Sequence, residues 1–414
     1  MPDRAERRRS WWWALGLGAG FAGIFSCWSL FWLPVVHGVQ AWMVPGDIWI
    51  TARVSEYIRY GAYPYLYQVD SGYYSLPLGA LLLTPAVAVA DALGLISGYP
   101  FTIAHPTMWL VLGPASALFG IPVLLGARRL AYAWGLRDRL VLVQVLALLA
   151  AVVPCTAAGH PEDLLAVAGT CFALAAVSEG RWEQAGWWMG FAVAGKQWAV
   201  LALPAVLLLC PAGRRRAMTT RVLLLPLALL TPCMVLDHTD ALRAMLLPTD
   251  PHGVPWGHPG LSVLLAGGVA SRWSRPAAVA LSVALAARFA RRRPARVGEL
   301  VAVAFVLRAL SEPLLLGYYL APALLVGALA LARRRGGLLG VDVACAALVA
   351  AWSLPEHVGA LLWWSGAAVV AALVVAAQLA AGRSAPPHRR TSSWSEKALR
   401  IVGPGADQVA ASTR

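Results

Sequence analysis

Charged residues are scarce in this sequence. Asp, Glu, Lys and Arg together make up 13% of its 414 residues, whereas soluble domains contain roughly 25%. Hydrophobic residues make up 59%, and the mean hydropathy is +0.65. Apolar stretches of about 17–25 residues recur from end to end, and each is long enough to cross a hydrocarbon core as a helix. The composition therefore excludes a soluble globular domain and predicts a protein that crosses a membrane many times.

The apolar stretches also lack the polar–apolar alternation of membrane β-barrels, so they are expected to satisfy their backbone hydrogen bonds as helices. We expect an all-α, polytopic transmembrane helix bundle with about 12 helical segments in the cell membrane. It would occupy residues 11–382, between a basic cytoplasmic tail (residues 1–10) and a disordered cytoplasmic tail (residues 383–414). The expected segments are residues 11–33, 76–96, 108–127, 140–158, 163–179, 187–210, 219–236, 276–290, 297–311, 313–332, 339–354 and 358–381.

Cysteine is also sparse. The chain has six cysteines, with no Cys-x-x-Cys pair, and most of them lie inside apolar runs. They are therefore interpreted as small core residues rather than as disulfides or zinc ligands. We expect neither a metal site nor a cofactor. The cysteines are Cys27, Cys155, Cys171, Cys210, Cys233 and Cys345.

Lysine is nearly absent, although the formal net charge is +14. The two lysines are Lys196 and Lys397, and arginines form short clusters between the apolar runs. Such clusters indicate loops that stay in the cytoplasm beside anionic membrane lipid. A nucleic-acid partner, which the charge would suggest in a soluble protein, is not expected. The clusters are residues 7–9, 214–216, 291–293, 333–335 and 389–390.

Two long polar loops, residues 34–75 and 237–275, interrupt the apolar pattern. Counting helices back from a cytoplasmic C-terminus places both loops outside the cell. The same count also places the basic loop of residues 128–139 outside, against the positive-inside pattern. We therefore expect one earlier segment to be broken or re-entrant, with Pro85 or Lys196 as the break.

The large first outer loop, residues 34–75, is rich in Tyr, Trp, Gly and Pro. Within it, residues 47–60 have the period of a helix that lies in the membrane interface. At the start of this helix, Asp47 could act as a general base on a hydroxyl acceptor. The Pro45-Gly46-Asp47 sequence is also a helix N-cap signal, and the two roles are compatible.

Three titratable residues, His160, Glu162 and Asp163, stand between two apolar runs. Such groups are costly to bury at a membrane boundary and are often functional, which favours substrate contact. The alternative is a solvated turn whose carboxylates cap the next helix. A metal site has less support, because His-x-Glu-Asp alone provides too few ligands at a recognisable spacing.

Lys196 lies in the middle of an apolar segment, in Ala-Gly-Lys-Gln-Trp. A charge held there needs an anionic partner. A lipid phosphate would serve, since lysine binds phosphate as a compact point charge. The alternatives are that Lys196 extends to the interface or pairs internally with Glu162 or Asp163.

Two further groups are candidates for substrate contact. His252 and His258 lie in the second long loop, which could instead be a plain extracellular loop. Glu312 and Tyr319 follow the segment 297–311. Arg308 and Glu312, at i,i+4 spacing, could simply pair, and Tyr319 could belong to an aromatic belt.

The order of these residues resembles the GT-C superfamily of membrane glycosyltransferases, which use polyprenyl-phosphate sugars. The resemblance rests on the acidic Asp47 just after the first span, on Gly61-Ala62-Tyr63-Pro64-Tyr65, and on Tyr74-Ser75-Leu76-Pro77-Leu78.

Within that superfamily the chain resembles glycosyltransferase family 87, which includes actinobacterial mannosyltransferases that act on phosphatidylinositol mannosides. The similarity covers most of residues 40–335. In that branch a turn before a helix is followed, after a basic loop, by a glycine-rich helix, a lysine and a proline-containing helix. This chain has the matching residues in the same order: His160-Pro161-Glu162-Asp163, Arg181, the glycine-rich run from Gly190 to Lys196, Pro204 and Arg214. The turn departs from the branch, which usually carries Gly-Gln where this chain has Gly159-His160-Pro161.

The resemblance implies a GT-C-like fold with an extracytoplasmic active site, in which Asp47 matches the catalytic base and Lys196 a basic position of the family. It implies a polyprenyl-phosphate sugar donor, a lipid-linked or glycan acceptor, and inversion at the anomeric carbon. A polytopic transporter or a lipid or polysaccharide flippase is the alternative. The residues expected to bind substrate are Lys196, His160, Glu162, Asp163, Tyr74, Gln197, His252, His258, Glu312 and Tyr319.

Overall fold

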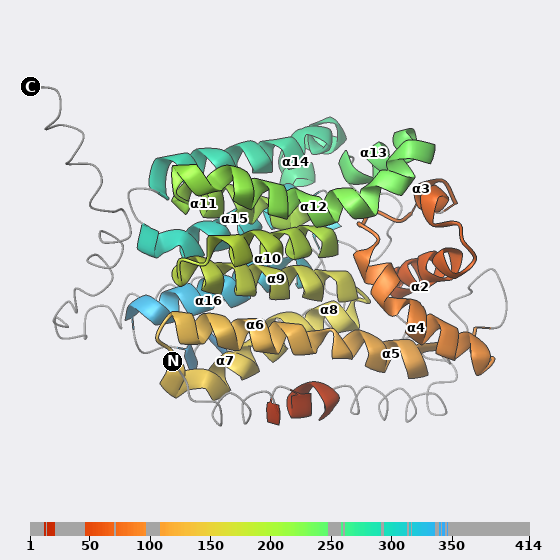
Figure 1. The fold of residues 1–414 in the computed structure, drawn as a ribbon, viewed down its shortest axis with the longest axis horizontal. Helices are drawn as coiled ribbons and strands as arrows, with labels where there is room; N and C mark the ends of the chain where they lie inside the picture. The colour runs from red at the N-terminus through yellow and green to blue at the C-terminus, as the bar shows by residue number, and fades with distance from the viewer. Residues whose placement is uncertain are drawn as a thin grey trace, which may run out of the picture.

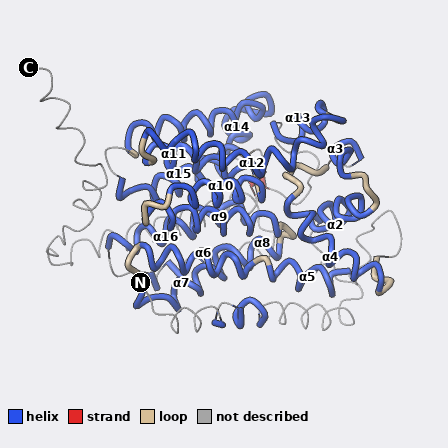
Figure 2. Tube along the Cα trace, in the orientation of Figure 1, coloured by secondary structure: helices blue, strands red, loops and turns tan. Residues whose placement is uncertain are grey.

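The computed structural model places most of the expected helical region. It describes residues 12–13, 15–20, 46–69, 72–96, 108–246, 258–259, 261–290, 294–312, 314–315, 317–335, 339–340, 342–343 and 346. Helices make up nearly all of these residues, and loops are short (Figure 2). This confirms the all-α class. Both expected tails, most of the first expected segment and most of the last two lie outside the described residues.

The helices stack in layers with their axes roughly aligned, while α2, α3, α4 and α13 lie together at one end (Figure 1). Two strands of two residues each, β1 (His258–Pro259) and β2 (Leu314–Leu315), pair antiparallel. In chain order the helices are α2 (Gly46–Arg59), η2 (Tyr63–Tyr65), α3 (Leu66–Val69), α4 (Leu78–Ala92), α5 (Trp109–Leu118), α6 (Gly120–Ala133), η4 (Arg137–Arg139), α7 (Leu140–Ala147), η5 (Leu148–Val152), α8 (Val153–Ala157), α9 (Pro161–Ser178), α10 (Trp182–Gly195), η6 (Gln197–Ala202), α11 (Leu203–Leu209), α12 (Ala212–Leu236), α13 (His238–Leu246), α14 (Leu261–Phe289), η8 (Pro294–Arg296), α15 (Val297–Ser311), η9 (Gly317–Leu320) and α16 (Ala321–Arg335).

Four helical stretches among the described residues are long and apolar enough to cross a membrane: 110–133, 137–156, 161–178 and 212–236. They differ in how far the protein itself covers them. The apolar part of α9 is 89% buried, whereas that of α12 is only 17% buried. An apolar helix that stays uncovered by protein is suited to contact lipid, so the structure supports a membrane protein with α9 at its centre. The expected number of about 12 segments stays a prediction.

Close helix contacts at glycines fix the direction of each helix in the centre of the bundle. A Cβ on Gly169 of α9 would lie 2.8 Å from Ala192 of α10, and one on Gly195 would lie 2.9 Å from Leu165. The two helices are therefore antiparallel. Small residues allow such close approach, as they do between membrane helices generally.

The segment around Lys196 folds back on itself, which corrects the expected single segment 187–210. A Cβ on Gly186 would meet Met218 of α12, and one on Gly190 would meet Val222. Since α10 and α12 therefore run in the same direction, the η6–α11 arm between them must run the opposite way. Lys196 has an extended backbone (φ −150°, ψ 129°) that separates the two arms. Lys196 is thus the expected break, whereas Pro85 lies inside the continuous helix α4.

The fold-back brings the basic loops together at one end of the bundle, which we call the arginine end: residues 128–139, 179–183, 214–221 and 333–335. Arg129 pairs with Glu179 at 2.6 Å, and Arg221 with Glu183 at 3.0 Å. The guanidinium of Arg333 lies 5.7 Å from the centre of the Trp134 ring. The helix count had placed the loop 128–139 opposite the other arginine clusters, against the positive-inside pattern. The fold-back at Lys196 removes this conflict, because the count had taken the folded-back segment as one crossing.

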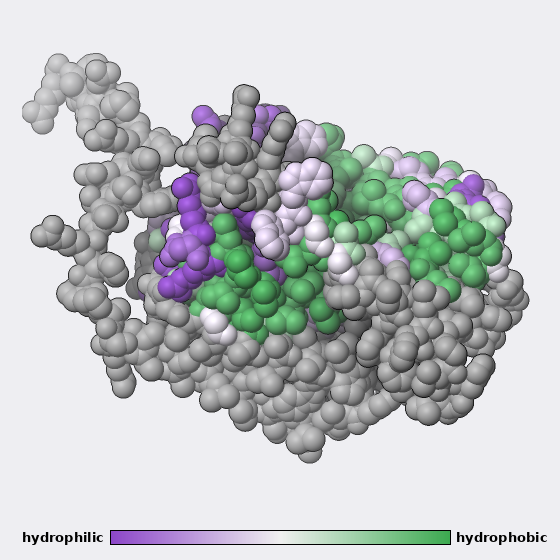
Figure 3. Space-filling view, turned by 90° about the horizontal axis from the view of Figure 1, so that it is seen from below, coloured by the Kyte–Doolittle hydropathy of each residue, from purple (hydrophilic) through white to green (hydrophobic). Residues whose placement is uncertain are grey.

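The arginine end lies at the left in Figure 1. Seen from below, hydrophilic residues gather at the left of the described surface, and hydrophobic residues cover its middle (Figure 3). This is the polarity of a bundle whose flank contacts lipid and whose end contacts water.

Both long loops contain helices. The helix expected at residues 47–60 is present as α2, which packs on α4, and its position in the membrane interface stays a prediction. In the second loop, expected over residues 237–275, the structure places α13 and the beginning of α14 at Leu261.

We predict that Gly190→Ala destabilises the fold by about 1–3 kcal/mol, the usual cost of overpacking. The added Cβ would lie 2.8 Å from the backbone oxygen of Arg221 and 2.9 Å from that of Val222. The measurement is thermal unfolding of the purified protein in detergent. Gly213→Ala is the matched control, because a Cβ there meets nothing within 4 Å. Equal unfolding temperatures for the two variants would contradict the α10–α12 contact.

Candidate functional site

The turn between α8 and α9 builds the centre of the candidate site. Gly159 has a φ of +77°, a conformation that costs glycine nothing. The His160 amide donates to the Cys155 oxygen at 2.8 Å, which closes the end of α8. Pro161 then begins α9, where its missing N–H is not needed. Glu162 and Asp163 thereby fall in the first turn of α9, where the helix dipole favours negative charge.

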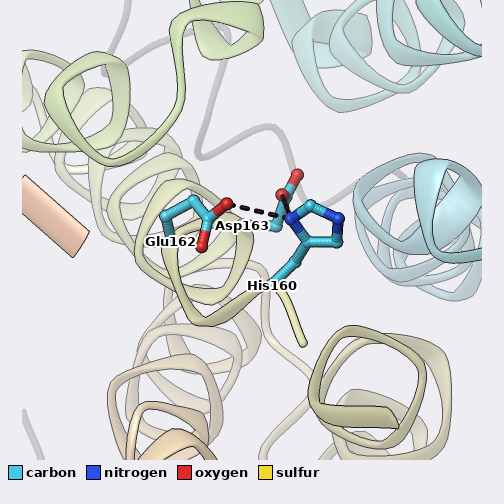
Figure 4. A group of neighbouring side chains, drawn as sticks. All are labelled: His160, Glu162 and Asp163. Carbon is cyan, nitrogen blue, oxygen red and sulfur yellow. Dashed lines mark hydrogen bonds and ion pairs between the residues drawn. The ribbon is translucent and has the colours of Figure 1, made fainter. Parts of the chain in front are cut away.

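These side chains meet below the surface (Figure 4). His160 Nδ1 lies 2.9 Å from Glu162 Oε1 and 3.8 Å from Asp163 Oδ2, and all three residues are buried. The alternative of a solvated turn is therefore excluded. The carboxylates do more than cap α9, since Glu162 contacts His160 and Lys196 and Asp163 accepts from Trp198.

Lys196 completes the cluster from the break between α10 and η6. Its Nζ lies 2.9 Å from Glu162 Oε1 and 3.6 Å from Asp163 Oδ2, and it donates to Ser75 Oγ at 2.5 Å. The lysine side chain is only 12% exposed. The internal pairing considered from the sequence is thus the arrangement in the structure. Contact with a lipid phosphate stays a prediction.

The loop before α4 is held in place by buried tyrosines. Tyr67 donates its hydroxyl hydrogen to the backbone oxygen of Ser75, and Tyr73 donates to that of Leu76, both at 2.9 Å. Burial raises the pKa of both phenols well above the usual value, so they stay protonated and keep donating. A Cβ on Gly79 would lie 2.7 Å from Glu162, so α4 approaches α9 closely there. Together these contacts position Ser75 beside the cluster.

Aromatic and amide groups extend the cluster to further segments. Trp198 Nε1 donates to Asp163 Oδ1 at 2.6 Å, and Gln197 Nε2 donates to the Tyr74 backbone oxygen at 2.5 Å. The Tyr318 hydroxyl lies 2.6 Å from His160 Nε2. Glu162 Oε1 is an acceptor, so in its neutral form the imidazole would carry its proton on Nδ1 and accept from Tyr318 at Nε2. A continuous hydrogen-bonded chain therefore runs from Tyr318 to Lys196.

Arg308, which the sequence offered as a possible partner of Glu312, is a buried residue beside this hydrogen-bonded chain. Its guanidinium lies 5.0 Å from the centre of the Trp198 ring and 4.2 Å from that of Tyr319. Glu312 Oε1 lies 3.9 Å from Arg308 Nε, while Oε2 of the same carboxylate lies 3.4 Å from Arg275. The expected i,i+4 pair thus exists but is loose. The sequence signals were an arginine inside the apolar run 297–311 and its i,i+4 spacing to Glu312.

The charges of the cluster decide what it can bind. His160, Glu162 and Asp163 place ligand atoms within 4.8 Å of one another, a spacing compatible with a metal ion. The Lys196 ammonium already contacts both carboxylates and supplies a positive charge at that place. Even with a protonated imidazole, two cations would face two carboxylates, so the cluster is not a net cationic site. Its chemistry is that of a fixed polar network with protons to hold or transfer.

The structure brings together most of the expected substrate-binding residues. The expected base Asp47 and the expected substrate-binding residue His252 cannot be placed at the site. Asp47 lies in the first turn of α2 with its side chain outside the described residues, and His252 lies outside them entirely. The backbone of His258 pairs with Leu315, three residues before Tyr318. The residues brought together are Tyr74, His160, Glu162, Asp163, Lys196 and Gln197, with Glu312 and Tyr319 beside them through Arg308.

Comparison with known proteins gives no relative for this chain: no family model matches it, and neither curated proteins nor solved structures yield a match.

We predict that Lys196→Met destabilises the protein by about 3–5 kcal/mol, because it leaves buried carboxylates without their cation. The double variant Lys196→Met with Glu162→Gln removes one stranded charge and should recover part of that loss. Thermal unfolding of both variants in detergent measures this. A single variant as stable as the wild type would show that the ion pair does not hold the bundle together.

Proposed function

We propose that the protein is a membrane glycosyltransferase that moves a sugar from a polyprenyl-phosphate donor to a lipid-linked or glycan acceptor, with mannose as the proposed sugar. One observation carries the proposal. Three segments with the resemblance to GT-C enzymes, residues 74–75, 160–163 and 196–197, are far apart in the chain but meet in one buried polar cluster. Packing of apolar helices alone would not require these segments to converge.

The cluster lies at the end of the bundle opposite the arginine end. Helix α9 begins at the cluster and reaches Glu179 at the arginine end, where Arg129 pairs with it. Arginine-rich loops stay in the cytoplasm, which supports an extracytoplasmic site in the cell membrane. A donor whose sugar is carried on a membrane-bound lipid is suited to such a site, since no nucleotide needs to be bound.

The proposed reaction is an inverting displacement. The acceptor hydroxyl oxygen forms a bond to the anomeric carbon, and the bond from that carbon to the phosphate oxygen breaks. The electron pair leaves with the polyprenyl phosphate, and the hydroxyl proton passes to the Asp47 carboxylate as general base. The site must also stabilise the charge that develops on the leaving phosphate.

A transporter or flippase is the second candidate, and one observation favours it. The helix broken at Lys196, with buried charges at the break, is a feature of transporter binding sites near the membrane midplane. A transporter should depend on Lys196 and Glu162 and tolerate a change at Asp47, whereas the proposed enzyme requires Asp47.

We predict that purified protein in nanodiscs transfers sugar from a radiolabelled polyprenyl-phosphate donor to a membrane-lipid acceptor extract. Asp47→Asn should lower the rate about 100-fold or more, the usual contribution of a general base. Asp138→Asn makes the same chemical change at the exposed arginine end and should leave the rate unchanged. The absence of transfer from mannose, glucose and arabinose donors, with Asp47→Asn acting as wild type in cells, would reject the enzyme and favour transport.

Cysteine labelling tests the proposed orientation. Thr239 and Asp138 are exposed at opposite ends of the bundle. A membrane-impermeant maleimide on intact cells should label the variant Thr239→Cys but label Asp138→Cys only after lysis. Unmodified protein gives the background, and four of its cysteines are buried. Labelling of Asp138→Cys in intact cells would place the arginine end outside and reject the proposed side of the site.

A further inference from the structure

We propose that Arg308 binds a phosphate-class anion at this site. That the anion is the leaving phosphate of the donor rests on the proposed function. The binding of phosphate by Arg308 can be tested without sugar transfer.

The charge of Lys196 is already matched inside the protein. Its ammonium contacts Glu162 and Asp163 and donates to Ser75. A phosphate placed against Lys196 would also lie close to two carboxylates, and like charges at that distance repel. The cation that meets an anionic substrate must therefore be another one.

Arg308 has the unused hydrogen-bonding capacity that such a ligand needs. Its side chain is only 6% exposed, yet Nε and Nη1 have no hydrogen-bond partner among the residues that the structure describes. Buried polar groups of native proteins are almost always paired. Glu312 does not supply the partner, because its nearest oxygen lies 3.9 Å from Nε and its other oxygen faces Arg275. Guanidinium groups bind phosphate oxygens through parallel N–H donors.

Two aromatic residues link Arg308 to the cluster. The guanidinium lies near the ring of Trp198, which donates to Asp163, and near the ring of Tyr319, which contacts the ring of Tyr318 beside His160. These ring contacts limit how the guanidinium can rotate, while Nε and Nη1 have no hydrogen-bond partner among the described residues. A phosphate bound there would lie beside the hydrogen-bonded chain that runs to Lys196.

A purely structural role is the competing interpretation, in which the aromatic rings and Glu312 together stabilise a buried arginine. The two interpretations differ in what Glu312 does. In the structural role Glu312 helps to hold Arg308, so its loss affects stability alone. In the binding role Glu312 competes with the anion, so its neutralisation should strengthen phosphate binding.

The experiment is calorimetric titration of the full-length protein in zwitterionic nanodiscs with farnesyl phosphate, inorganic phosphate and uncharged farnesol. We expect farnesyl phosphate to bind and farnesol to bind far more weakly. Arg308→Met should weaken binding of farnesyl phosphate about 10-fold to 100-fold, since hydrogen bonds to charged groups contribute that much. Arg308→Lys should weaken it less, and Glu312→Gln should strengthen it several-fold. If inorganic phosphate also binds with the same dependence on Arg308, the site recognises the phosphate group itself. If only farnesyl phosphate binds, the site recognises a lipid phosphate.

Arg129→Met, which removes a paired arginine at the other end, is the matched control and should bind as wild type. Equal affinities of wild type, Arg308→Met and Arg308→Lys for farnesyl phosphate would overturn the proposal. It would also be overturned if neither wild type nor Glu312→Gln binds farnesyl phosphate or inorganic phosphate. If Arg308→Met does not fold, an unchanged affinity in Glu312→Gln overturns it. Arg308-dependent phosphate binding without sugar transfer would support the phosphate site and reject the proposed glycosyltransferase. Sugar transfer whose KM is unaffected by Arg308→Lys would support the glycosyltransferase and reject the phosphate site.

Discussion

The buried contact between Lys196 and the carboxylates of Glu162 and Asp163 is the interaction on which the bundle depends. A lone charge at that depth would be strongly destabilising, so the break after α10 and the first turn of α9 must lie together. Ser75 ties the start of α4 to the same point. Because the chain turns back at Lys196, every later helix takes its direction from this contact. The gathering of the arginines at one end follows from it.

The cations of the molecule differ in their partners because of this contact. Lys196 is held by the protein's own carboxylates and serves the architecture of the site. Arg308 lies near two aromatic rings, with a Glu312 oxygen 3.9 Å from its Nε, and it carries the proposed phosphate site. The exposed arginines at the opposite end are the basis of the proposed orientation in the membrane. The three groups of cations differ in their burial and in their partners.

The sequence predicted the helices well because continuous apolar runs in lipid leave the backbone few alternatives. It also indicated the unusual residues, since His160, Glu162, Asp163 and Lys196 are polar groups inside apolar surroundings. Counting helices left the loop 128–139 on the wrong side and so indicated a broken segment, but the sequence alone did not decide between Pro85 and Lys196 as the break. Whether a run folds back depends on contacts with residues far away in the chain, here Glu162 and Ser75 for Lys196. For the same reason the sequence offered Arg308 only as a partner of Glu312, since its contacts with Trp198 and Tyr319 depend on tertiary packing.

The fold-back at Lys196 also bears on the order in which the protein is made. The 14-residue helix α10 is shorter than the roughly 20 residues that span a bilayer, and a lysine follows it at once. A ribosome delivers α9, with both carboxylates, before it delivers α10 and Lys196. The counter-ions are therefore already in the membrane when the ammonium arrives, and the two arms can enter as a pair against α9. A chain with the acidic turn placed after the lysine would have to hold an uncompensated cation in lipid during synthesis.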